Sequence, residues 1–369
     1  MRYLICAGGT GGGVYPALAV WQRLHEVDPE AEVLWVGGQG GMEETLVRRA
    51  GVPFQAIPAA GVHGVGWRRL PGNVARLARG FFAARRVLRA FHPDVVFFTG
   101  GYVAVPVALA ARGRPMVLFV PDIEPGLALK TITPLARAIA VTVEPARAFF
   151  PASKTVVVTG YPLRREIEAW IGQKARAREH LGLPKDAFVT LVFGGSRGAR
   201  SINRALMKQL DALLPHTTIV HISGQLDWPH VHAFRETLPE DQRARYHAYP
   251  YLHDDDMGAA LAAADLVVAR AGASTLGEFP AFGLPAILVP YPYAWRYQQR
   301  NAAYLAERGA ARILPDADLP QRLASEVLAL IQDADQRTRM AHAMQRLHQP
   351  RAAERIAELL RQQAGGRHD

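Results

Sequence analysis

The chain has 369 residues, of which 49% are hydrophobic, and this length is too great for a typical single core but comfortable for two. Lys and Arg exceed Asp and Glu by 43 to 33, and residues 1–163 hold 17 of the basic and 10 of the acidic side chains. This positive excess favours partners of negative charge, and the alternative is an ordinary solvated surface. The single cysteine, Cys6, excludes an intrachain disulfide, and no stretch approaches the ~20 apolar residues of a membrane-spanning helix.

Short apolar runs alternate with helix-like patterns through the first half of the chain. The expected strands are Tyr3–Ala7, Glu32–Val36, Phe54–Ile57, Val95–Thr99, Met116–Phe119, Ala138–Val143 and Thr155–Thr159. The expected helices include Pro16–Val27, Met42–Ala50, Asn73–Ala90 and Val103–Ala111. This alternation predicts a doubly wound, largely parallel α/β sheet.

A glycine-rich loop, residues 8–13, follows the first expected strand and reads Gly-Gly-Thr-Gly-Gly-Gly. A strand that enters a glycine turn and then a helix presents free N–H groups at the positive end of the helix, which suits anionic or polar ligands. A dinucleotide loop is disfavoured, because the glycines are denser than in G-x-G-x-x-G and the residues ~20 positions on, Glu30 and Glu32, lie before or at the next strand. A purely structural tight turn is the other alternative. Gly100-Gly101-Tyr102 forms a further turn, expected at the same edge of the sheet.

The expected helix Asn73–Ala90 mixes arginines with aromatic residues, and Trp67 precedes it. Phe81, Phe82, Arg85 and Arg86 could lie on an anionic membrane surface. The residues alone favour the alternative of an ordinary helix with one apolar face in the core. Nucleic-acid binding is a weaker hypothesis, since no known nucleic-acid-binding motif is present.

The second half repeats the rhythm after a charged stretch, Arg164 to Lys185, that we expect to connect two domains. Its expected strands are Phe188–Phe193, Thr218–Ile222, Arg245–Ala248, Leu266–Val268, Ala286–Val289 and Ala311–Leu314. The helices expected to close the chain are Gln321–Gln332, Arg337–Leu347 and Arg351–Gln363.

Two segments of the second half follow strands and open helices, as a phosphate site does. In residues 194–198, Gly-Gly-Ser-Arg-Gly, the Ser196 hydroxyl and neighbouring amides could hold a phosphate. In residues 269–278, backbone amides would face an anion while Glu278 accepts from sugar hydroxyls. Simple helix capping by Ser274 or Thr275 is an equally good interpretation of that segment.

Two side-chain amides, Gln298 and Gln299, open another expected helix and could read sugar hydroxyls, although such residues are most often solvated surface. The thirteen histidines show no metal-ligand spacing, so no metal site is predicted. The acidic run His253–Asp256 is better explained as the start of the helix Met257–Ala264.

Taken together, these segments resemble glycosyltransferase family 28. The matching stretches are residues 7–20, 99–103, 125–127, 160–164, 194–203, 255–257 and 270–293, followed by Gln298 and Asn301. The resemblance implies a GT-B fold, with two Rossmann-like doubly wound domains facing across a cleft. It implies an acceptor and membrane-facing domain at residues 1–163 and a donor domain at residues 164–369, whose last helix can pack back on the first domain.

The activity that the resemblance implies is inverting transfer of N-acetylglucosamine from UDP-N-acetylglucosamine to a lipid-linked muramyl-pentapeptide acceptor, lipid I to lipid II, in peptidoglycan synthesis. Ser196 and Arg164 would contact the donor diphosphate, the Leu252 backbone would meet uracil, and Glu278 would bind the ribose. The remaining donor-binding residues implied are Thr10, Gly11, Gly12, Arg270, Ala273, Ser274, Thr275, Gln298 and Gln299. The acceptor and membrane face would include Tyr102, Trp67, Phe81, Phe82, Arg85 and Arg86.

The chain departs from the family pattern on the acceptor side. Gly13 stands where the family has the histidine proposed as general base. A Glu-Gln-Asn stretch of the family is replaced by Val120, Pro121 and Asp122, and Arg197 replaces a usual glutamine. A carboxylate could take over as the base, and Asp122 is the leading candidate, with Glu124 and His63 as weaker ones.

The partners expected from the resemblance are UDP-N-acetylglucosamine, the lipid-linked acceptor and an anionic membrane surface, with no nucleic acid and no strictly required metal. The expected location is the cytoplasm, peripherally on the inner face of the cell membrane. Two alternatives stay open: a divergent family-28 paralogue with a different acceptor, and a non-catalytic UDP-sugar-binding protein. A hydrolase or epimerase of the same fold is more distant, because it needs its own acid and base carboxylates.

Overall fold

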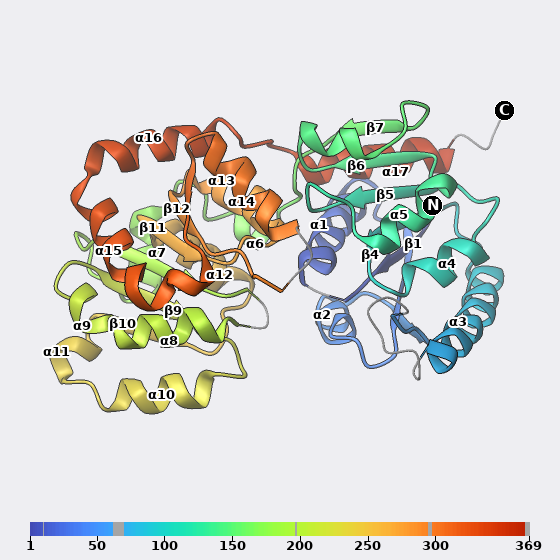
Figure 1. Cartoon of the computed structure of the whole chain (residues 1–369). Helices are drawn as coiled ribbons and strands as arrows, with labels where there is room; N and C mark the ends of the chain where they lie inside the picture. The colour runs from blue at the N-terminus through green and yellow to red at the C-terminus, as the bar shows by residue number, and fades with distance from the viewer. Residues whose placement is uncertain (10, 62–69, 196–197, 294–296, 366–369) are drawn as a thin grey trace. The chain divides into compact units, whose positions relative to one another are not determined.

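The computed structural model describes residues 1–9, 11–61, 70–195, 198–293 and 297–365 (Figure 1). The chain divides into two compact units. The first unit consists of Met1–Arg164 and Arg351–Asp369, and the second of Arg165–Pro350. The chain therefore passes from one unit to the other twice, after Arg164 and after Pro350.

The first unit is built on a seven-stranded sheet in the order β3-β2-β1-β4-β5-β6-β7, with every neighbouring pair parallel. Its strands are β1 (Arg2–Ala7), β2 (Glu32–Gly38), β3 (Phe54–Ile57), β4 (Val95–Gly100), β5 (Met116–Val120), β6 (Ala138–Val141) and β7 (Thr155–Val158). Its helices are α1 (Gly11–Val27), α2 (Glu43–Arg49), α3 (Leu70–Phe91), α4 (Ala104–Ala110), α5 (Leu127–Ile132), η1 (Thr133–Leu135), η2 (Glu144–Phe149) and α17 (Ala352–Gly365). The predicted doubly wound parallel sheet is confirmed.

Helix α1 begins earlier than the sequence pattern suggested, at Gly11 instead of Pro16. The glycine loop therefore ends after residue 10, and three of its glycines form the first turn of the helix. Pro16 has no N–H to donate to the Gly12 carbonyl four residues back. The Tyr161 hydroxyl lies 3.4 Å from that carbonyl oxygen and donates to it instead, so a proline is tolerated inside the helix.

The last helix of the chain, α17, belongs to the first unit, where it packs against α1 (Figure 1). Its apolar residues, among them Ile356 and Leu360, are fully buried. Arg355 donates from Nε and Nη2 to the Thr159 carbonyl oxygen at 3.1 and 2.7 Å. Glu354 pairs with Arg23 of α1 at 3.3 Å, so charged contacts as well as burial fix the helix.

The second unit carries a six-stranded parallel sheet in the order β10-β9-β8-β11-β12-β13. Its strands are β8 (Val189–Phe193), β9 (Thr218–Ile222), β10 (Tyr246–Tyr249), β11 (Leu266–Ala269), β12 (Ala286–Leu288) and β13 (Ala311–Ile313). Its helices are α6 (Arg165–Glu168), α7 (Lys174–His180), α8 (Arg200–Lys208), α9 (Leu210–Leu213), α10 (Trp228–Glu236), α11 (Glu240–Arg243), α12 (Asp254–Ala263), η3 (Ala273–Leu276), α13 (Glu278–Phe282), α14 (Tyr297–Glu307), η4 (Asp316–Asp318), α15 (Leu319–Gln332) and α16 (Ala334–Gln345).

The stretch expected to be a connection, Arg164 to Lys185, is instead largely an integral part of the second unit. Helices α6 and α7 both pack against α12. Trp170 between them is buried, and its Nε1 donates to the Asp255 carboxylate at 2.7 Å. The charged residues misled the sequence interpretation, because the apolar anchors Ile167 and Trp170 are few and widely spaced.

Each sheet reverses its winding direction once, between β1 and β4 in the first unit and between β8 and β11 in the second. In open parallel sheets, ligands bind outside the carboxyl ends of the strands at this switch point. The loops that follow these four strands are the four glycine-containing segments that the sequence singled out. The topology therefore places the candidate site of each unit at its switch point.

Candidate functional site

The two glycine loops of the first unit lie in direct backbone contact at the switch point. A Cβ atom on Gly101 would lie only 2.7 Å from the Gly8 carbonyl oxygen. Gly9 and Gly101 also have φ angles of +92° and +88°, which side chains strongly disfavour. Glycine is therefore required here so that the loops after β1 and β4 can approach each other.

Gly13, the position of the family histidine, is buried in the first turn of α1 and faces the end of β4. Thr99 donates its hydroxyl to the Gly13 carbonyl oxygen at 2.8 Å. A Cβ atom on Gly13 would lie 3.3 Å from Thr99 Oγ1 and 3.5 Å from the Thr99 carbonyl oxygen. A side chain at position 13 would thus need its neighbours to move.

A buried carboxylate that the sequence interpretation missed, Glu43, connects the loops after β1 and β2. Glu43 is 2% exposed, and its oxygens accept from Gly38 N at 2.9 Å and Gly9 N at 3.4 Å. Cβ atoms on Gly8 or Gly41 would overlap the carboxylate, at 2.5 and 2.3 Å. The Glu43 carboxylate thus occupies the space that side chains at these glycine positions would need.

The single cysteine, Cys6, is fully buried in β1. Burial raises the pKa of its thiol well above the ordinary value, and the Glu43 carboxylate adds to this effect. The thiol therefore stays protonated and does not act as a nucleophile.

The leading candidate base, Asp122, is half-buried on the loop after β5, the strand next to β4. Thr142 fixes the start of this loop by donating its hydroxyl to the carbonyl oxygens of Val120 and Pro121, at 3.1 and 2.9 Å. Glu124, the weaker candidate, forms an ion pair with Lys130 at 2.7 Å. Asp122 therefore lies at the same sheet edge as the glycine loops, about 10 Å from β1 if two strand spacings are counted.

Arg164, at the end of the first unit's main segment, is largely buried. Its guanidinium carbon lies 4.0 Å from the centroid of the Tyr15 ring, which is a cation–π contact. Tyr102, by contrast, is 60% exposed beside the second glycine loop. Arg164 is thus held in place by α1, while Tyr102 is accessible to a ligand.

Helix α3 has one apolar face in the core, as the residues alone favoured. Ala84, Val87 and Leu88 are buried on one face. Phe82 is 59% exposed, and its ring meets that of Phe81 at 5.4 Å between centroids. The basic residues named with them, Arg85 and Arg86, are exposed as well. The helix therefore contributes to the core and also presents an aromatic ring among arginines to solvent.

The glycine loop of the second unit is shaped by two close approaches. A Cβ atom on Gly194 would lie 2.2 Å from Ala199 N, and one on Gly198 would lie 2.4 Å from the Ser223 carbonyl oxygen. Gly198 also has a φ angle of +74°. The loop after β8 is therefore pressed against the loop after β9, and only glycine allows this.

A buried polar network supports this loop from beneath. Asn203 of α8 donates through Nδ2 to the Ser223 carbonyl oxygen at 2.8 Å and to Asp227 at 3.0 Å, so its Oδ1 faces His221 Nε2 at 2.9 Å. His221 Nε2 must then carry the proton, and Nδ1 accepts from the Tyr246 hydroxyl at 2.7 Å. Burial raises the pKa of Tyr246, so its hydroxyl stays a donor.

The buried imidazole makes the second unit sensitive to acid. Burial lowers the pKa of His221 to about 3, and this effect outweighs that of the Asp227 carboxylate, which acts to raise the pKa. An unfolded histidine titrates near 6.5, so the contribution to stability is full above about pH 6.5 and falls as the pH drops toward 3. We expect the unfolding free energy to lose about 1.4 kcal/mol per pH unit there from this group.

Urea denaturation at pH 7, 6 and 5 measures this dependence. Replacing His221 by glutamine should make the pH slope shallower by about one proton. Replacing the exposed His216 by glutamine is the matched control and should leave the slope unchanged. Equal slopes in the wild type and the His221 variant would contradict the assignment.

Arg270, expected to bind donor, is buried and engaged by protein groups. Its Nη1 pairs with Asp316 at 2.5 Å and donates to the Val289 carbonyl oxygen at 3.1 Å. Its Nη2 donates to Ser201 Oγ at 2.7 Å. This geometry favours a positioning role, in which Arg270 ties the loop after β11 to the start of α8.

The segment after β11 forms a short 3-10 helix, η3, before α13. Thr275 donates its N–H and its hydroxyl to the Gly272 carbonyl oxygen, at 3.1 and 2.7 Å, so its amide is already engaged. Ala273 and Ser274 open the helix, where N–H groups have no intrahelical acceptor. Of the three amides expected to meet phosphate, these two suit the task best.

The remaining donor-side residues lie on the segments that follow β10, β11 and β12 of the second unit. Leu252 is buried just before α12, and Glu278 begins α13. Gln298 accepts from Tyr291 N at 2.9 Å, which fixes its amide, while Gln299 is exposed. Among the described residues, nothing accepts from the Gln298 amide NH₂, which is proposed below to contact a ligand.

Several predicted residues lie outside the part of the chain that the structure describes: Thr10, His63, Trp67, Ser196 and Arg197. Among the described residues, no group of three or more His, Cys, Asp or Glu side chains is arranged to hold a metal ion. Within the same residues, no helix combines the length and apolarity needed to cross a bilayer.

The chain matches two family descriptions in the order expected for a two-domain protein. Residues 3–141 match the glycosyltransferase family 28 N-terminal domain, and residues 189–356 match the glycosyltransferase family 28 C-terminal domain. The chain belongs to glycosyltransferase family 28. The resemblance noted from its motifs is therefore confirmed.

Relatives match this family member over its whole length. A protein of Desulforudis audaxviator (strain MP104C) is 41% identical over 99% of both chains. One of Roseiflexus sp. (strain RS-1) is 39% identical over 98% of this chain and 94% of the relative. Both are named UDP-N-acetylglucosamine--N-acetylmuramyl-(pentapeptide) pyrophosphoryl-undecaprenol N-acetylglucosamine transferase. The crystal structure of Acinetobacter baumannii MurG is similar with a TM-score of 0.73 and 28% identity, covering 98% of this chain and 99% of that one.

Proposed function

We propose that this family-28 member transfers N-acetylglucosamine from UDP-N-acetylglucosamine to N-acetylmuramyl-(pentapeptide) pyrophosphoryl-undecaprenol, converting lipid I to lipid II. The observation that carries the proposal is the 41% identity over 99% of the chain to a relative of that name. The geometry supports it, because both switch points carry glycine loops able to approach phosphate groups.

The second unit is proposed to bind the donor. The N–H groups of Ala273 and Ser274, with the loop of Ser196, would meet the diphosphate, and Glu278 would accept from the ribose hydroxyls. Leu252 would contact uracil through its backbone, while Gln298 and Gln299 would read the sugar. Gly11, Gly12, Thr10 and Arg164 of the first unit complete the proposed set, with Arg270 and Thr275 holding the loops in place.

In the proposed reaction, an acceptor hydroxyl oxygen forms a bond to C1 of N-acetylglucosamine, and the bond from C1 to the UDP oxygen breaks. Inversion at C1 follows from attack opposite the leaving group. Charge develops on the departing diphosphate, where helix N–H groups and the Arg164 guanidinium can stabilise it without a metal. The acceptor proton must pass to a base.

We propose that Asp122 is that base. Gly13 cannot serve, since it has no side chain. Asp122 is a carboxylate at the correct edge of the sheet, on a loop fixed by Thr142. Positioning of both substrates supplies the remaining rate enhancement.

A transfer assay tests the proposed function. The purified full chain is incubated with radiolabelled UDP-N-acetylglucosamine and a short-chain lipid I analogue, and product is separated by chromatography. The expected result is a labelled disaccharide lipid. UDP binding without transfer or hydrolysis would overturn the proposal in favour of a UDP-sugar-binding protein, whereas transfer only to a different acceptor would indicate a paralogue.

We further propose peripheral membrane binding on the cytoplasmic side through α3. Arg85 and Arg86 would attract anionic lipid and Phe82 would enter the interface. Replacing Arg85 and Arg86 by glutamate is expected to weaken binding to phosphatidylglycerol vesicles at least about tenfold, since each basic residue contributes about 1 kcal/mol. Vesicle co-sedimentation measures the effect.

The matched control replaces Arg112 and Arg137 by glutamate. Both are exposed and lie on the segments just before β5 and β6 instead of on α3. This control should keep vesicle binding close to the wild-type value. Equal losses in the two double variants would show that only net charge matters, and would contradict a membrane face on α3.

A further inference from the structure

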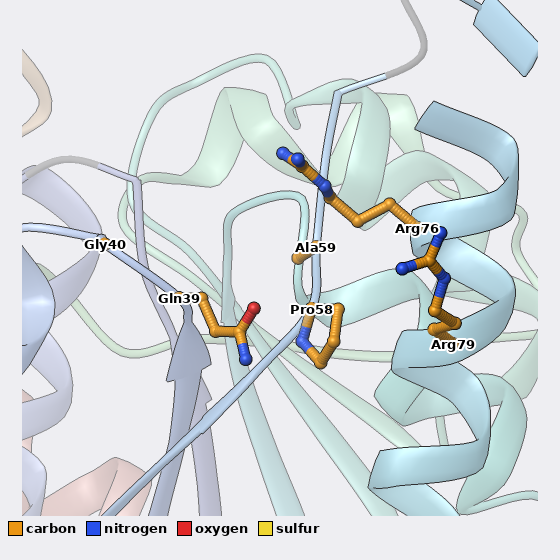
Figure 2. A pocket seen from close by; sticks show the side chains of 6 residues that line it. All are labelled: Gln39, Gly40, Pro58, Ala59, Arg76 and Arg79. Carbon is orange, nitrogen blue, oxygen red and sulfur yellow. The ribbon is translucent and has the colours of Figure 1, made fainter. Parts of the chain in front are cut away.

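A hollow of about 420 Å³ lies at the carboxyl edge of the first unit's sheet, between helix α3 and the segments that follow β2 and β3. It is lined by Gln39, Gly40, Pro58, Ala59, Arg76 and Arg79. Figure 2 shows Arg76 extending from α3 to the segment with Pro58 and Ala59 and Arg79 lying closer to the helix, while Gln39 comes from the loop after β2. Among the described residues, the lining thus contains two cationic groups, one amide and no carboxylate.

Close packing builds the walls of this hollow. A Cβ atom on Gly80 of α3 would lie 2.2 Å from the Pro58 carbonyl oxygen, so glycine lets the helix approach the loop after β3. Asn73 of the same helix donates to the Gly61 carbonyl oxygen at 2.6 Å. A Cβ atom on Gly61 would in turn lie 2.8 Å from the Tyr102 ring. The segment after β3 is therefore held by helix α3 on one side and by the loop after β4, which carries Tyr102, on the other.

The two arginines of the hollow are not neutralised by the described residues. No described carboxylate forms an ion pair with Arg76 or Arg79. The surrounding stretch, residues 45–93, contains nine arginines and no aspartate or glutamate. Positions three apart on a helix are neighbours, so the like charges repel each other until an anion lies between them.

The hollow is joined to the first glycine loop by a carboxylate bridge. Glu43 accepts from Gly9 N of that loop and from Gly38 N, the residue before Gln39. A ligand in the hollow would therefore contact Gln39, and the segment of Gln39 is linked through Glu43 to Gly9 of the first glycine loop. This connection links the arginines to the first unit's part of the proposed site.

We propose that this hollow binds the diphosphate of the lipid-linked acceptor, with Arg76 and Arg79 as its ligands. The inference rests on the proposed function, since the acceptor is the substrate with a pyrophosphoryl group. Guanidinium groups match phosphate oxygens with two parallel N–H donors each, and the volume lies within the range of small-molecule sites. The Gln39 amide supplies a further donor.

Replacing Arg76 and Arg79 by glutamine tests the proposal with a soluble short-chain acceptor analogue in the absence of membranes. The acceptor KM is expected to rise by about 10- to 100-fold, as loss of hydrogen bonds to charged groups predicts. The donor KM should stay within about twofold. The Arg112 and Arg137 double glutamine variant, with the same loss of charge at the opposite sheet edge, should behave as the wild type.

A second measurement does not depend on transfer. Calorimetry follows inorganic pyrophosphate binding with UDP saturating the donor site, and the Arg76 and Arg79 variant should bind at least about tenfold more weakly than the control. If no chain transfers sugar but this difference persists, the proposed function fails and the anion site stands. Unchanged acceptor KM and unchanged pyrophosphate binding would overturn the site. Loss of binding to anionic vesicles alone would also overturn it, by assigning the arginines to phospholipid headgroups.

Discussion

Replacement of Asp122 by asparagine is expected to lower kcat by ~10²–10⁴-fold, the usual contribution of a positioned general base. Asparagine keeps the size and hydrogen-bonding capacity of the side chain but cannot take a proton. The acceptor and donor KM values should change little, because the loop stays fixed by Thr142. Steady-state transfer kinetics with both substrates varied measure this outcome.

The control for this experiment is Glu124→Gln on the same loop. Glu124 is ion-paired with Lys130, so we expect a much smaller decrease in kcat. UDP binding, measured by calorimetry, should be the same in both variants and the wild type. An unchanged kcat for Asp122→Asn would eliminate Asp122 as the base, and a larger effect at Glu124 would transfer the role to that residue.

Replacement of Glu43 by alanine is expected to destabilise the first unit by about 2–4 kcal/mol. The N–H groups of Gly9 and Gly38 would lose their acceptor, and an unsatisfied buried donor costs about 1–3 kcal/mol. The first glycine loop, which carries Thr10, Gly11 and Gly12 of the proposed donor-binding set, would also lose its support, so we expect the donor KM to rise. Urea denaturation gives the unfolding free energy, and kinetics at a temperature where the variant is folded give the KM.

The neighbouring Glu44 offers a matched control, because it is one residue away and forms only a surface ion pair with Arg48 at 3.0 Å. Glu44→Ala should change stability by less than about 1 kcal/mol. Glu43→Gln retains one acceptor oxygen and is expected to lie between the wild type and Glu43→Ala. Similar effects at positions 43 and 44 would refute the bridging role.

The positions of the strands could be predicted from the sequence, because parallel strands that are buried on both faces consist of short apolar runs. Strands β4, β5 and β8 have this form, and each is followed by the glycine or proline that ends it. The glycine loops were also recognisable, since dense glycine after a strand lowers stability unless a close approach requires it. These signals lie within short segments of the chain, so a single sequence is enough to recognise the strands and the glycine loops.

The start of α1 and the role of α6 and α7 did not follow from local signals. Glycine and Pro16 disfavour a helix start at residue 11, but packing against Thr99 and the Tyr161 hydroxyl stabilises it. Helices α6 and α7 looked like a charged linker because their burial depends on α12, far along the chain. Tertiary contacts thus overrode propensity at both places.

The sequence by itself determined the family, the two parallel sheets and the loops at their switch points, because these depend on motifs and periodicity within short segments. Only the tertiary structure decided which polar groups act together. Nothing local distinguishes Glu43 from Glu44, or Arg76 from Arg85. The sheet order brings the loops after β1, β2 and β3 together, and this turns one glutamate into a buried bridge and two of many arginines into the lining of a hollow.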